Sequence, residues 1–339
     1  MKVVCPLISG SGLEVYHRRL GIGLSHLGVQ SELVPFSPRW EFFPWALEWK
    51  ARKTVEDLVC DLVHTHAEYG CLFRRKDKPL VITLHHSSVD RVYLASLPFP
   101  IRVHHQLLLR PSVRKALGMA DKLVAVSFDA RSTHHELFEK DLEIQVIHNG
   151  IDANLFRPVD VESSPTDNQV VIFFSGNHTR RKGFDLLVPV MKRLGDDFVL
   201  RYTAGMRQSD LGVRDVPNMK CLGCLTEEQL LVEINKAAIV FQPSRREGFG
   251  ISILEAMACG KPVVSTNCSA IPELIDHGNG GYLCEVDSVE QMVTAIRNLA
   301  QSVELRRKMG AHNRQVVLKR FTLEQMSSRY LSLYQSLLS

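Results

Sequence analysis

The sequence predicts an α/β protein made of two Rossmann-like domains in tandem, each a doubly wound parallel sheet with helices on both faces. The chain has 339 residues, which is more than one domain usually holds. Short apolar runs alternate with longer amphipathic segments along its whole length, a pattern typical of parallel sheets. The alternation stops once, near the middle of the chain, and then restarts.

The first half provides six apolar runs, followed by a linker. Buried strands are expected at 3–9, 31–36, 61–66, 80–86, 122–127 and 145–152. The segment RPVDVESSPTDN, which begins at Arg157, has two prolines, three acidic residues and no periodicity, and this composition indicates a linker. We therefore predict an N-terminal domain over 1–157.

The second half repeats the alternation and ends in a helix. Strands are expected at 170–176, 198–205, 219–223, 238–244, 262–266 and 281–286. A C-terminal domain is therefore predicted over 158–320. The segment 321–339 carries apolar residues near helical spacing, so we expect a helix that packs back toward the N-terminal domain.

The composition excludes several classes of protein. A net charge of +4 with 23% charged residues is ordinary for a globular protein and too mild for nucleic acid as the main partner. No window approaches the roughly 20 apolar residues of a spanning helix, and the first residues resemble a strand more than a signal peptide. We expect a cytoplasmic protein.

The eight cysteines predict no metal site. Six are scattered singly in apolar surroundings, where cysteine behaves as a small buried hydrophobe. Cys221 and Cys224 form one CxxC, but neither a second pair nor a suitable pair of histidines follows. Packing is the expected role of this pair too.

The candidate site lies in PSRREGFGISILEAMACG, where seven residues separate Glu247 from Glu255. The pattern predicts a strand, a glycine loop and a helix N-terminus, whose N–H groups and dipole favour anions. Helix capping would explain Glu247. It does not explain Glu255, whose helical neighbours are apolar, because a buried carboxylate needs a hydrogen-bonding partner. Ribose hydroxyls would suit it.

The stretch EGFGISILE resembles the glutamate-seven-glutamate motif of retaining glycosyltransferases with the GT-B fold, the family 4 (glycosyl transferases group 1) type. VIHNGIDANLFRP, SGNHTRRKGFDLL and ACGKPVVSTNCSAIPELIDHGNGGYLCEV are similar to further segments of this family, in order and at spacing. The resemblance is dense over about 145–300. It implies two domains that face each other across a cleft, the first for a saccharide or lipid-linked saccharide acceptor and the second for a nucleotide-diphospho-sugar donor. It also implies transfer with retention of configuration, in surface polysaccharide or lipopolysaccharide synthesis.

The resemblance also assigns roles to residues of the donor domain. Glu255 would accept hydrogen bonds from the ribose, and Glu247, as a catalytic residue, would approach the sugar hydroxyls. Backbone amides of the turn would line the sugar and phosphate, from Gly248, Phe249, Gly250 and Ile251. No cofactor or metal is implied.

A lysine and an arginine of the family normally contact the diphosphate. Lys182 stands at the lysine position, but the arginine position holds Asn177. This is a departure from the family pattern, and Arg180 or Arg181 could supply the missing charge.

In the N-terminal domain two positions match the family. His85, at the end of an apolar strand, would act as a second catalytic residue near the donor sugar, with His86 as a competitor for the role. Gly12 would lie at the edge of the cleft under the donor phosphates. His64 and His66 are expected to order the edge of the sheet.

Three other functions can be compared with the residues of this chain. A nicotinamide-binding domain needs GxGxxG and an acid at the end of the second strand, and neither is present. A nucleotide-sugar epimerase of similar shape would not carry the glutamate motif. A non-catalytic nucleotide- or sugar-binding protein on the same fold remains the main alternative, mildly favoured by Asn177.

Two segments raise the question of a membrane. Residues 37–53 hold all three tryptophans, Trp40, Trp45 and Trp49, next to basic residues, and 91–122 are basic with interleaved leucines. Aromatic or apolar residues beside cations suit an anionic membrane surface. A core segment and a solvated helix face explain them equally well, so peripheral membrane contact stays open here.

Overall fold

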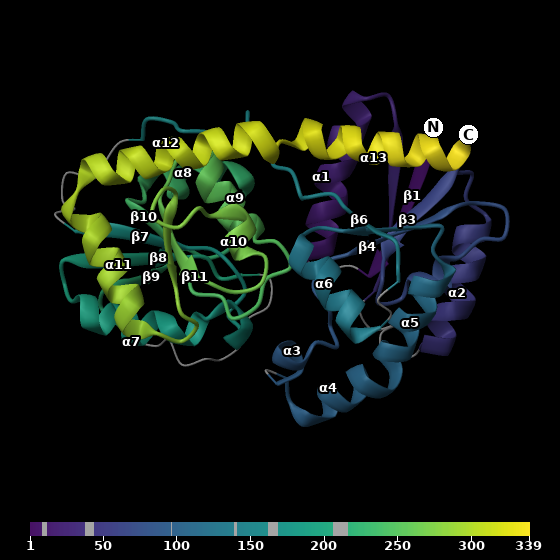
Figure 1. The fold of residues 1–339 in the computed structure, drawn as a ribbon, viewed down its shortest axis with the longest axis horizontal. Coiled ribbons are helices and arrows are strands. Elements are labelled where there is room, and N and C mark those ends of the chain that lie inside the picture. The colour runs from purple at the N-terminus through teal and green to yellow at the C-terminus, as the bar shows by residue number, and fades with distance from the viewer. Residues whose placement is uncertain (9–11, 38–43, 96, 139–140, 162–168, 206–215) are drawn as a thin grey trace. The chain divides into compact units, whose positions relative to one another are not determined.

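The computed structural model describes residues 1–8, 12–37, 44–95, 97–138, 141–161, 169–205 and 216–339, the side chains of 44–48 and 52 excepted. They form two compact units. The first contains Met1–Gly150 together with Leu323–Ser339, and the second contains Ile151–Thr322. Figure 1 shows both units.

The first unit is a parallel sheet of six strands in the order β2-β1-β3-β4-β5-β6. Its strands are β1 (Lys2–Ile8), β2 (Gln30–Phe36), β3 (Leu62–His66), β4 (Leu80–Leu84), β5 (Lys122–Ala125) and β6 (Ile144–Val146). Its helices are α1 (Gly12–His26), α2 (Pro44–Glu56), α3 (Arg91–Ala95), α4 (Phe99–His104), α5 (Arg110–Met119), α6 (Phe128–Leu137) and α13 (Leu323–Leu338), with short helical turns η2 (Gly70–Phe73) and η3 (His105–Leu109).

The C-terminal helix α13 belongs to the first unit because it packs closely on α1 (Figure 1). A Cβ on Gly23 of α1 would lie 2.0 Å from Ser327 Oγ of α13, so only glycine permits this approach. A buried polar network joins the two helices to the sheet. Tyr16 donates to Tyr330 at 2.5 Å, and Tyr334 contacts His64 Nδ1 at 2.7 Å.

The second unit repeats the architecture with six parallel strands in the order β12-β11-β10-β7-β8-β9. Its strands are β7 (Val170–Phe174), β8 (Phe198–Tyr202), β9 (Met219–Cys221), β10 (Ile239–Gln242), β11 (Val263–Thr266) and β12 (Gly281–Cys284). Its helices are η4 (Arg180–Lys182), α7 (Phe184–Leu194), α8 (Glu227–Lys236), α9 (Ile251–Ala258), α10 (Ile271–Leu274), α11 (Val289–Gln301) and α12 (Val303–Arg320). The predicted fold class, two doubly wound α/β domains, is confirmed.

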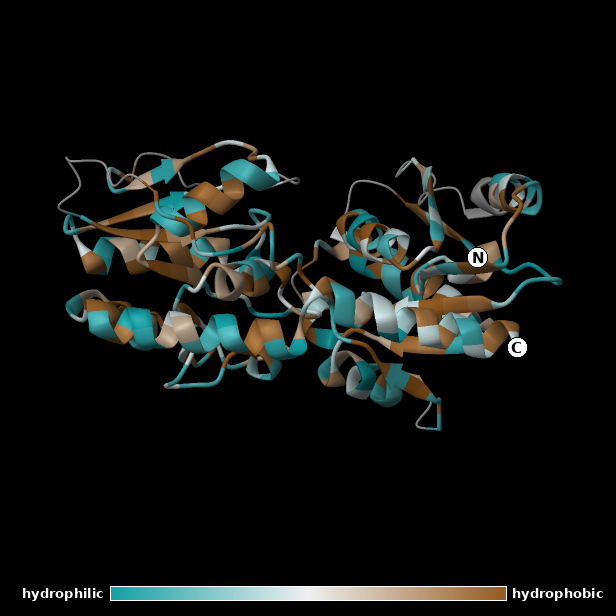
Figure 2. Cartoon of the chain, turned by 90° about the horizontal axis from the view of Figure 1, so that it is seen from above, coloured by the Kyte–Doolittle hydropathy of each residue, from teal (hydrophilic) through white to brown (hydrophobic). Residues whose placement is uncertain are grey.

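Hydrophobic residues dominate the strands of both sheets, and the surrounding helices mix hydrophobic with hydrophilic residues (Figure 2). This is the distribution that a parallel sheet covered on both faces requires.

The units divide at Gly150 and Ile151, earlier than the linker predicted from composition. Hydrogen bonds explain the difference. The backbone N–H of Ile151 donates to Phe321 O at 2.9 Å, and Arg314 donates to Phe156 O at 2.8 Å. Residues 151–157 are therefore held in the second unit. The strand expected over 145–152 is correspondingly shorter, since β6 ends at Val146.

Two other expectations were wrong. His64 and His66 do not order a sheet edge, because β3 lies between β1 and β4 in the interior of the sheet and both side chains are buried. Cys221 and Cys224 do not pack in the core, because Cys221 ends the edge strand β9 and both thiols are exposed.

Candidate functional site

The glutamate motif forms a strand, turn and helix in the second unit, as predicted. Strand β10 ends at Gln242, and α9 begins at Ile251 with Gly250 as its N-cap. Gly250 has a φ of 103°, a left-handed conformation that glycine adopts without strain. Since α9 starts at Ile251, Glu255 lies about one turn into the helix.

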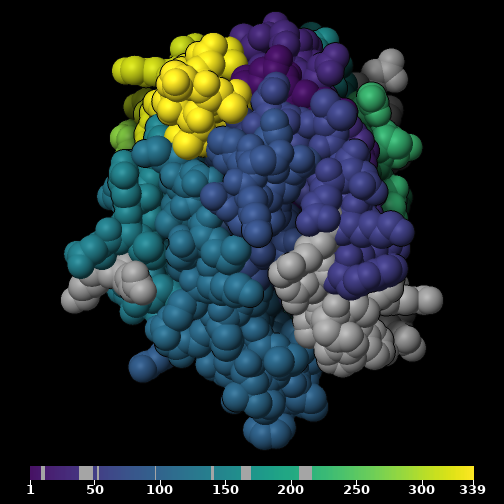
Figure 3. Space-filling view, turned by 90° about the vertical axis from the view of Figure 1, so that its right-hand side faces the viewer, coloured from purple at the N-terminus to yellow at the C-terminus, as the bar shows by residue number. Residues whose placement is uncertain are grey.

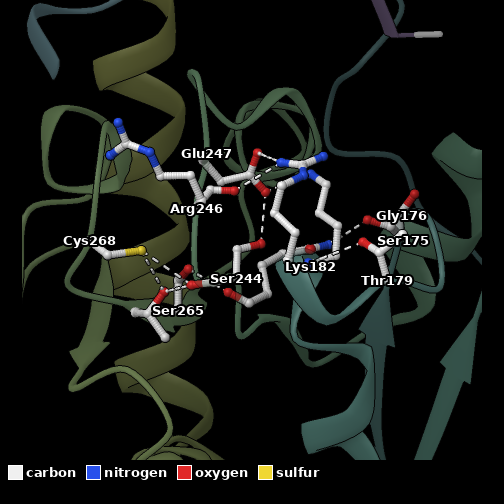
Figure 4. A network of polar contacts seen from close by, with 12 residues as sticks. Ser175, Gly176, Thr179, Lys182, Ser244, Arg246, Glu247, Ser265 and Cys268 are labelled. Carbon is white, nitrogen blue, oxygen red and sulfur yellow. Dashed lines mark hydrogen bonds and ion pairs between the residues drawn. The ribbon is translucent and has the colours of Figure 1, made fainter. Parts of the chain in front are cut away.

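Glu247 is the centre of a buried polar cluster (Figure 4). Its side chain is only 6% exposed. Lys182 Nζ donates to Glu247 Oε1 at 2.5 Å, and Ser244 Oγ donates to the same oxygen at 2.7 Å. The guanidinium of Arg181 lies 3.7 Å from the other carboxylate oxygen. One carboxylate oxygen thus accepts hydrogen bonds from a charged and a neutral donor, and the other lies near a second cation.

Lys182 reaches Glu247 because two loops of the second unit interlock. Thr179 caps η4 by accepting from the backbone N–H of Lys182 at 3.3 Å, and Gly183 ends η4 with a φ of 69°. A Cβ on Gly183 would lie 1.9 Å from Pro243 O, so the loop after β7 touches the loop after β10 at a glycine. Arg245 N donates to Arg181 O at 2.8 Å and secures the same contact.

The charges of this cluster shift the pKa values of both partners. Burial raises the pKa of the Glu247 carboxyl, but Lys182 and Arg181 outweigh it, so the net pKa lies below its ordinary value. Burial lowers the pKa of Lys182, and Arg181 adds to this effect, while Glu247 and Glu255 oppose it. Lys182 is therefore a desolvated cation under the influence of both glutamates of the motif.

Glu255 is buried in α9, at 5% exposure. Its carboxylate raises the pKa of Lys182, and this effect is smaller than that of Glu247. The structure therefore brings Lys182 and Glu247 into direct contact and buries Glu255 in the helix that follows the turn. Phe249 of the turn is buried and packs edge-on against Phe321, with ring centroids 5.7 Å apart. Its side chain anchors the turn, which leaves the backbone of Gly248–Ile251 as the part that can face a ligand.

Asn177 stands where the family pattern has an arginine. The Asn177 backbone lies against Gly205, where an added Cβ would be 2.8 Å from Asn177 Cα. Of the two arginines weighed as substitutes, Arg181 belongs to the cluster, whereas Arg180 is 70% exposed and 3.7 Å from Asp185.

His178 was missed by the sequence analysis. Its ring stacks on Phe184 at 3.8 Å between centroids, and its Nε2 contacts Thr203 O at 2.7 Å. It therefore holds the loop before η4 against β8. The signal available in the sequence was only its position between Asn177 and Lys182, two residues already singled out.

His85 lies in the first unit, directly after β4. Its ring packs edge-on against Tyr16 at 4.7 Å. Burial lowers the pKa of His85 to about 3, so the imidazole is neutral at physiological pH. Its Nε2 is buried and has no hydrogen-bond partner among the described residues. The competitor His86 packs against Tyr93 instead. Gly12 is the exposed first residue of α1.

Within the described part of the chain, one group of side chains could offer ligands to a metal ion. Cys5, His17 and His64 are buried in the first unit, with ligand-type atoms within 4.8 Å of one another. However, both ring nitrogens of His64 are hydrogen-bonded, to Thr83 and to Tyr334, each at 2.7 Å. A metal would have to break one of these bonds, so we assign the group to the packing of α13 against the sheet.

The comparisons with known proteins agree with this fold. Residues 157–316 match the family model described as "Glycosyl transferases group 1", and residues 3–155 match "Glycosyltransferase Family 4". Together the two models span most of the chain, one per unit. The chain therefore belongs to the family 4 glycosyltransferases.

Among curated proteins, the chain is 26% identical over 325 residues to N-acetyl-alpha-D-glucosaminyl L-malate synthase of Bacillus anthracis, covering 86% of this chain and 79% of the relative. Among solved structures, it is similar in fold to a sucrose-phosphate synthase from Thermosynechococcus elongatus, with a TM-score of 0.82, 18% identity and 99% of both chains covered. It is also similar to Anabaena Alr3699/HepE in complex with UDP-glucose, with a TM-score of 0.78, 20% identity, and 99% and 100% of the two chains covered. The fold is GT-B.

Proposed function

We propose that this glycosyltransferase moves a hexosyl or related sugar from a nucleotide-diphospho-sugar donor to a saccharide acceptor, with retention of anomeric configuration. The observation that carries the proposal is the contact between Lys182 and Glu247 beside the turn that starts α9. A UDP-glucose complex of the structurally similar Anabaena protein supports a donor of this class.

The donor diphosphate would be held by Lys182 and the N-terminus of α9. A lysine ammonium has three N–H donors, and Lys182 directs one of them to Glu247 Oε1. The others can serve phosphate oxygens, which the helix N-terminus also favours. Gly248 has no Cβ that would obstruct the close approach of a ligand to the backbone. A Cβ on Gly250 would instead lie 3.2 Å from Ile253 Cδ1 and 3.3 Å from Leu274 Cδ1, so that glycine serves the packing of the turn.

The two glutamates would then contact two different parts of the donor. Glu255 accepts hydrogen bonds from the ribose hydroxyls, and Glu247 accepts from hydroxyls of the transferred sugar. Because Glu247 also keeps Lys182 in place, it links the sugar position to the phosphate position. His85, neutral at physiological pH, would offer a hydrogen bond to the sugar and not a charge.

The proposed reaction occurs on one face of the sugar. The bond between the anomeric carbon and the phosphate oxygen breaks, and its electron pair stays on the nucleoside diphosphate. The acceptor hydroxyl oxygen bonds to the anomeric carbon from the same side, and its proton passes to the departing phosphate oxygen. Lys182 and the α9 N-terminus stabilise the negative charge that develops there. No metal is required in this scheme.

The acceptor would be a saccharide, free or lipid-linked, and the product a surface polysaccharide or lipopolysaccharide. We place the enzyme in the cytoplasm, with peripheral contact to the inner face of the plasma membrane. Among the described residues, no helix is both long and apolar enough to cross a bilayer.

The test begins with donor identity. Thermal shifts of the full chain with UDP, GDP, ADP and TDP sugars identify the donor. Titration calorimetry then measures the affinity of three variants for that donor. Glu255→Ala removes the ribose contact. Glu255→Gln keeps the side-chain volume and controls for a folding defect. Glu290→Ala, an exposed acid in the first turn of α11, is the matched control.

Hydrogen bonds to a charged group contribute about 1.5–3 kcal/mol, so Glu255→Ala should weaken donor binding about 10- to 100-fold. Glu290→Ala should leave it unchanged. Donor affinity within twofold of wild type for both Glu255 variants would contradict the ribose role. Failure of every nucleotide sugar to bind or to be turned over would contradict the function itself.

A further inference from the structure

The segment from α3 to α5 in the first unit carries an unusual exposed surface, which we call the α4 surface. It comprises the exposed apolar side chains Val92, Phe99, Ile101, Val103, Leu107 and Leu108. Single exposed apolar residues are normal, but a concentration of them within one short segment marks an interaction site. This segment forms the lower end of the first unit in Figures 1 and 3.

The exposure of apolar side chains is clearest in helix α4. It is six residues long, contains a phenylalanine, an isoleucine and a valine, and buries none of its residues. Phe99 is 73% exposed, and Leu107 in the following turn is 69% exposed. A helix normally turns its apolar side chains toward its own core. The apolar side chains of α4 have no core of their own to pack on among the described residues.

The charge of the same segment favours an anionic membrane over a second copy of this chain as the partner of the α4 surface. Residues 91–120 contain Arg91, Arg102, Arg110, Arg114 and Lys115 but no aspartate or glutamate. Arg91, Arg102, Arg114 and Lys115 are exposed. A surface that is both apolar and basic complements the interface of an anionic bilayer, where apolar side chains enter the acyl boundary and cations remain among the headgroups. A second copy of this chain would bring like charges together.

We propose that the α4 surface docks the protein on an anionic membrane, with Phe99, Leu107 and Leu108 inserted and the neighbouring arginines at headgroup level. This inference deepens the proposed function by naming the element that would hold the acceptor-binding unit at a lipid surface. The other segment with membrane character in the sequence, 37–53, is described only in part. Trp40 and the side chain of Trp45 lie outside the described residues, and Trp49 is exposed beside Lys53.

The experiment is co-sedimentation of the full chain with vesicles of neutral phosphatidylcholine, with or without 30% phosphatidylglycerol. The test variant is F99S/L107S/L108S. The matched control is I22S/V59S/V303S, which removes exposed apolar side chains elsewhere (46%, 82% and 54% exposed). All six positions are exposed, so both triple variants should fold, and circular dichroism checks that they do.

We expect wild type and the control to bind anionic vesicles at low salt, and the test variant to bind at least tenfold more weakly. R91Q/R102Q should reduce the preference for anionic over neutral vesicles, and added salt should do the same. Binding is measured without turnover, so failure here is distinguishable from failure of the proposed function.

Three results would overturn the proposal. The first is a wild-type chain that does not bind anionic vesicles at low salt. The second is a test variant that binds as wild type does. The third is a wild-type dimer that becomes a monomer in the test variant without any vesicle binding, which would assign the α4 surface to a second copy of the chain.

Discussion

The buried ion pair of Lys182 and Glu247 gives the first prediction, which concerns the stability of the second unit. At 2.5 Å between Nζ and Oε1, the gross attraction is about 7 kcal/mol at an effective dielectric constant of about 20. The desolvation of both ions offsets much of it. The net value is therefore measured best by a double-mutant cycle with Lys182→Met, Glu247→Gln and the double variant.

Each single substitution leaves one charged group buried without its main partner, a change that costs about 3–5 kcal/mol in buried pairs. We expect about 3 kcal/mol for Lys182→Met, because Arg181 and Ser244 still contact Glu247. The double variant removes both charges, so it should lose less than the sum of the single losses, by about 2 kcal/mol. Lys192→Met, at an exposed lysine of α7, is the control and should change stability by under about 0.5 kcal/mol.

The assay is urea unfolding followed by two signals. All three tryptophans are in the first half of the chain, at 40, 45 and 49, so their fluorescence reports the first unit, whereas far-UV circular dichroism reports both. The loss of unfolding free energy in the Lys182 and Glu247 variants should appear in the transition followed by circular dichroism. A Lys182→Met chain as stable as the Lys192→Met chain, or strictly additive losses in the cycle, would refute the reasoning.

Two further predictions concern the backbone and the pH. Gly183→Ala should cost at least about 3 kcal/mol, because its Cβ would meet Pro243 O at 1.9 Å. Gly223→Ala, in the same unit and also at positive φ but with open space around it, should cost only about 1 kcal/mol of strain. Equal losses of stability in urea unfolding would contradict this. Burial lowers the pKa of His64 and His85 to about 3, from about 6.5 when unfolded. Below pH 6.5 the unfolded state thus binds more protons. Tryptophan-detected stability should be full above pH 6.5 and decline toward pH 3, by up to about 1.4 kcal/mol per pH unit for each histidine. Identical urea midpoints at pH 7 and pH 5 would count against it.

Much of the fold and site could be predicted from the chain because the signals are local. The alternation of apolar runs with amphipathic segments specifies parallel α/β units, since a strand covered on both faces must be apolar throughout. The glycines around Phe249 predict a turn into a helix for the same local reason. Glu255 stood out as an acid among apolar helical neighbours, and the structure buries it.

Other features depend on residues that are far apart in sequence and therefore leave no local pattern. His64 looked like an edge residue until the strand order placed β3 inside the sheet, because period and composition do not encode which strands are neighbours. The exposed thiol of Cys221 follows from the same strand order, since β9 is an edge strand.

By itself, the sequence determined that this protein has two Rossmann-like units and a glycine turn between two glutamates, because backbone propensity and hydrophobic period act over a few residues. Only the tertiary structure decided that Lys182, 65 residues before Glu247, directs its charge at that carboxylate. It also decided that the apolar side chains of α4 remain in contact with solvent. Both outcomes depend on which surfaces meet when the chain closes on itself, and burial changes the energy of a charge or a methyl group only once that packing exists.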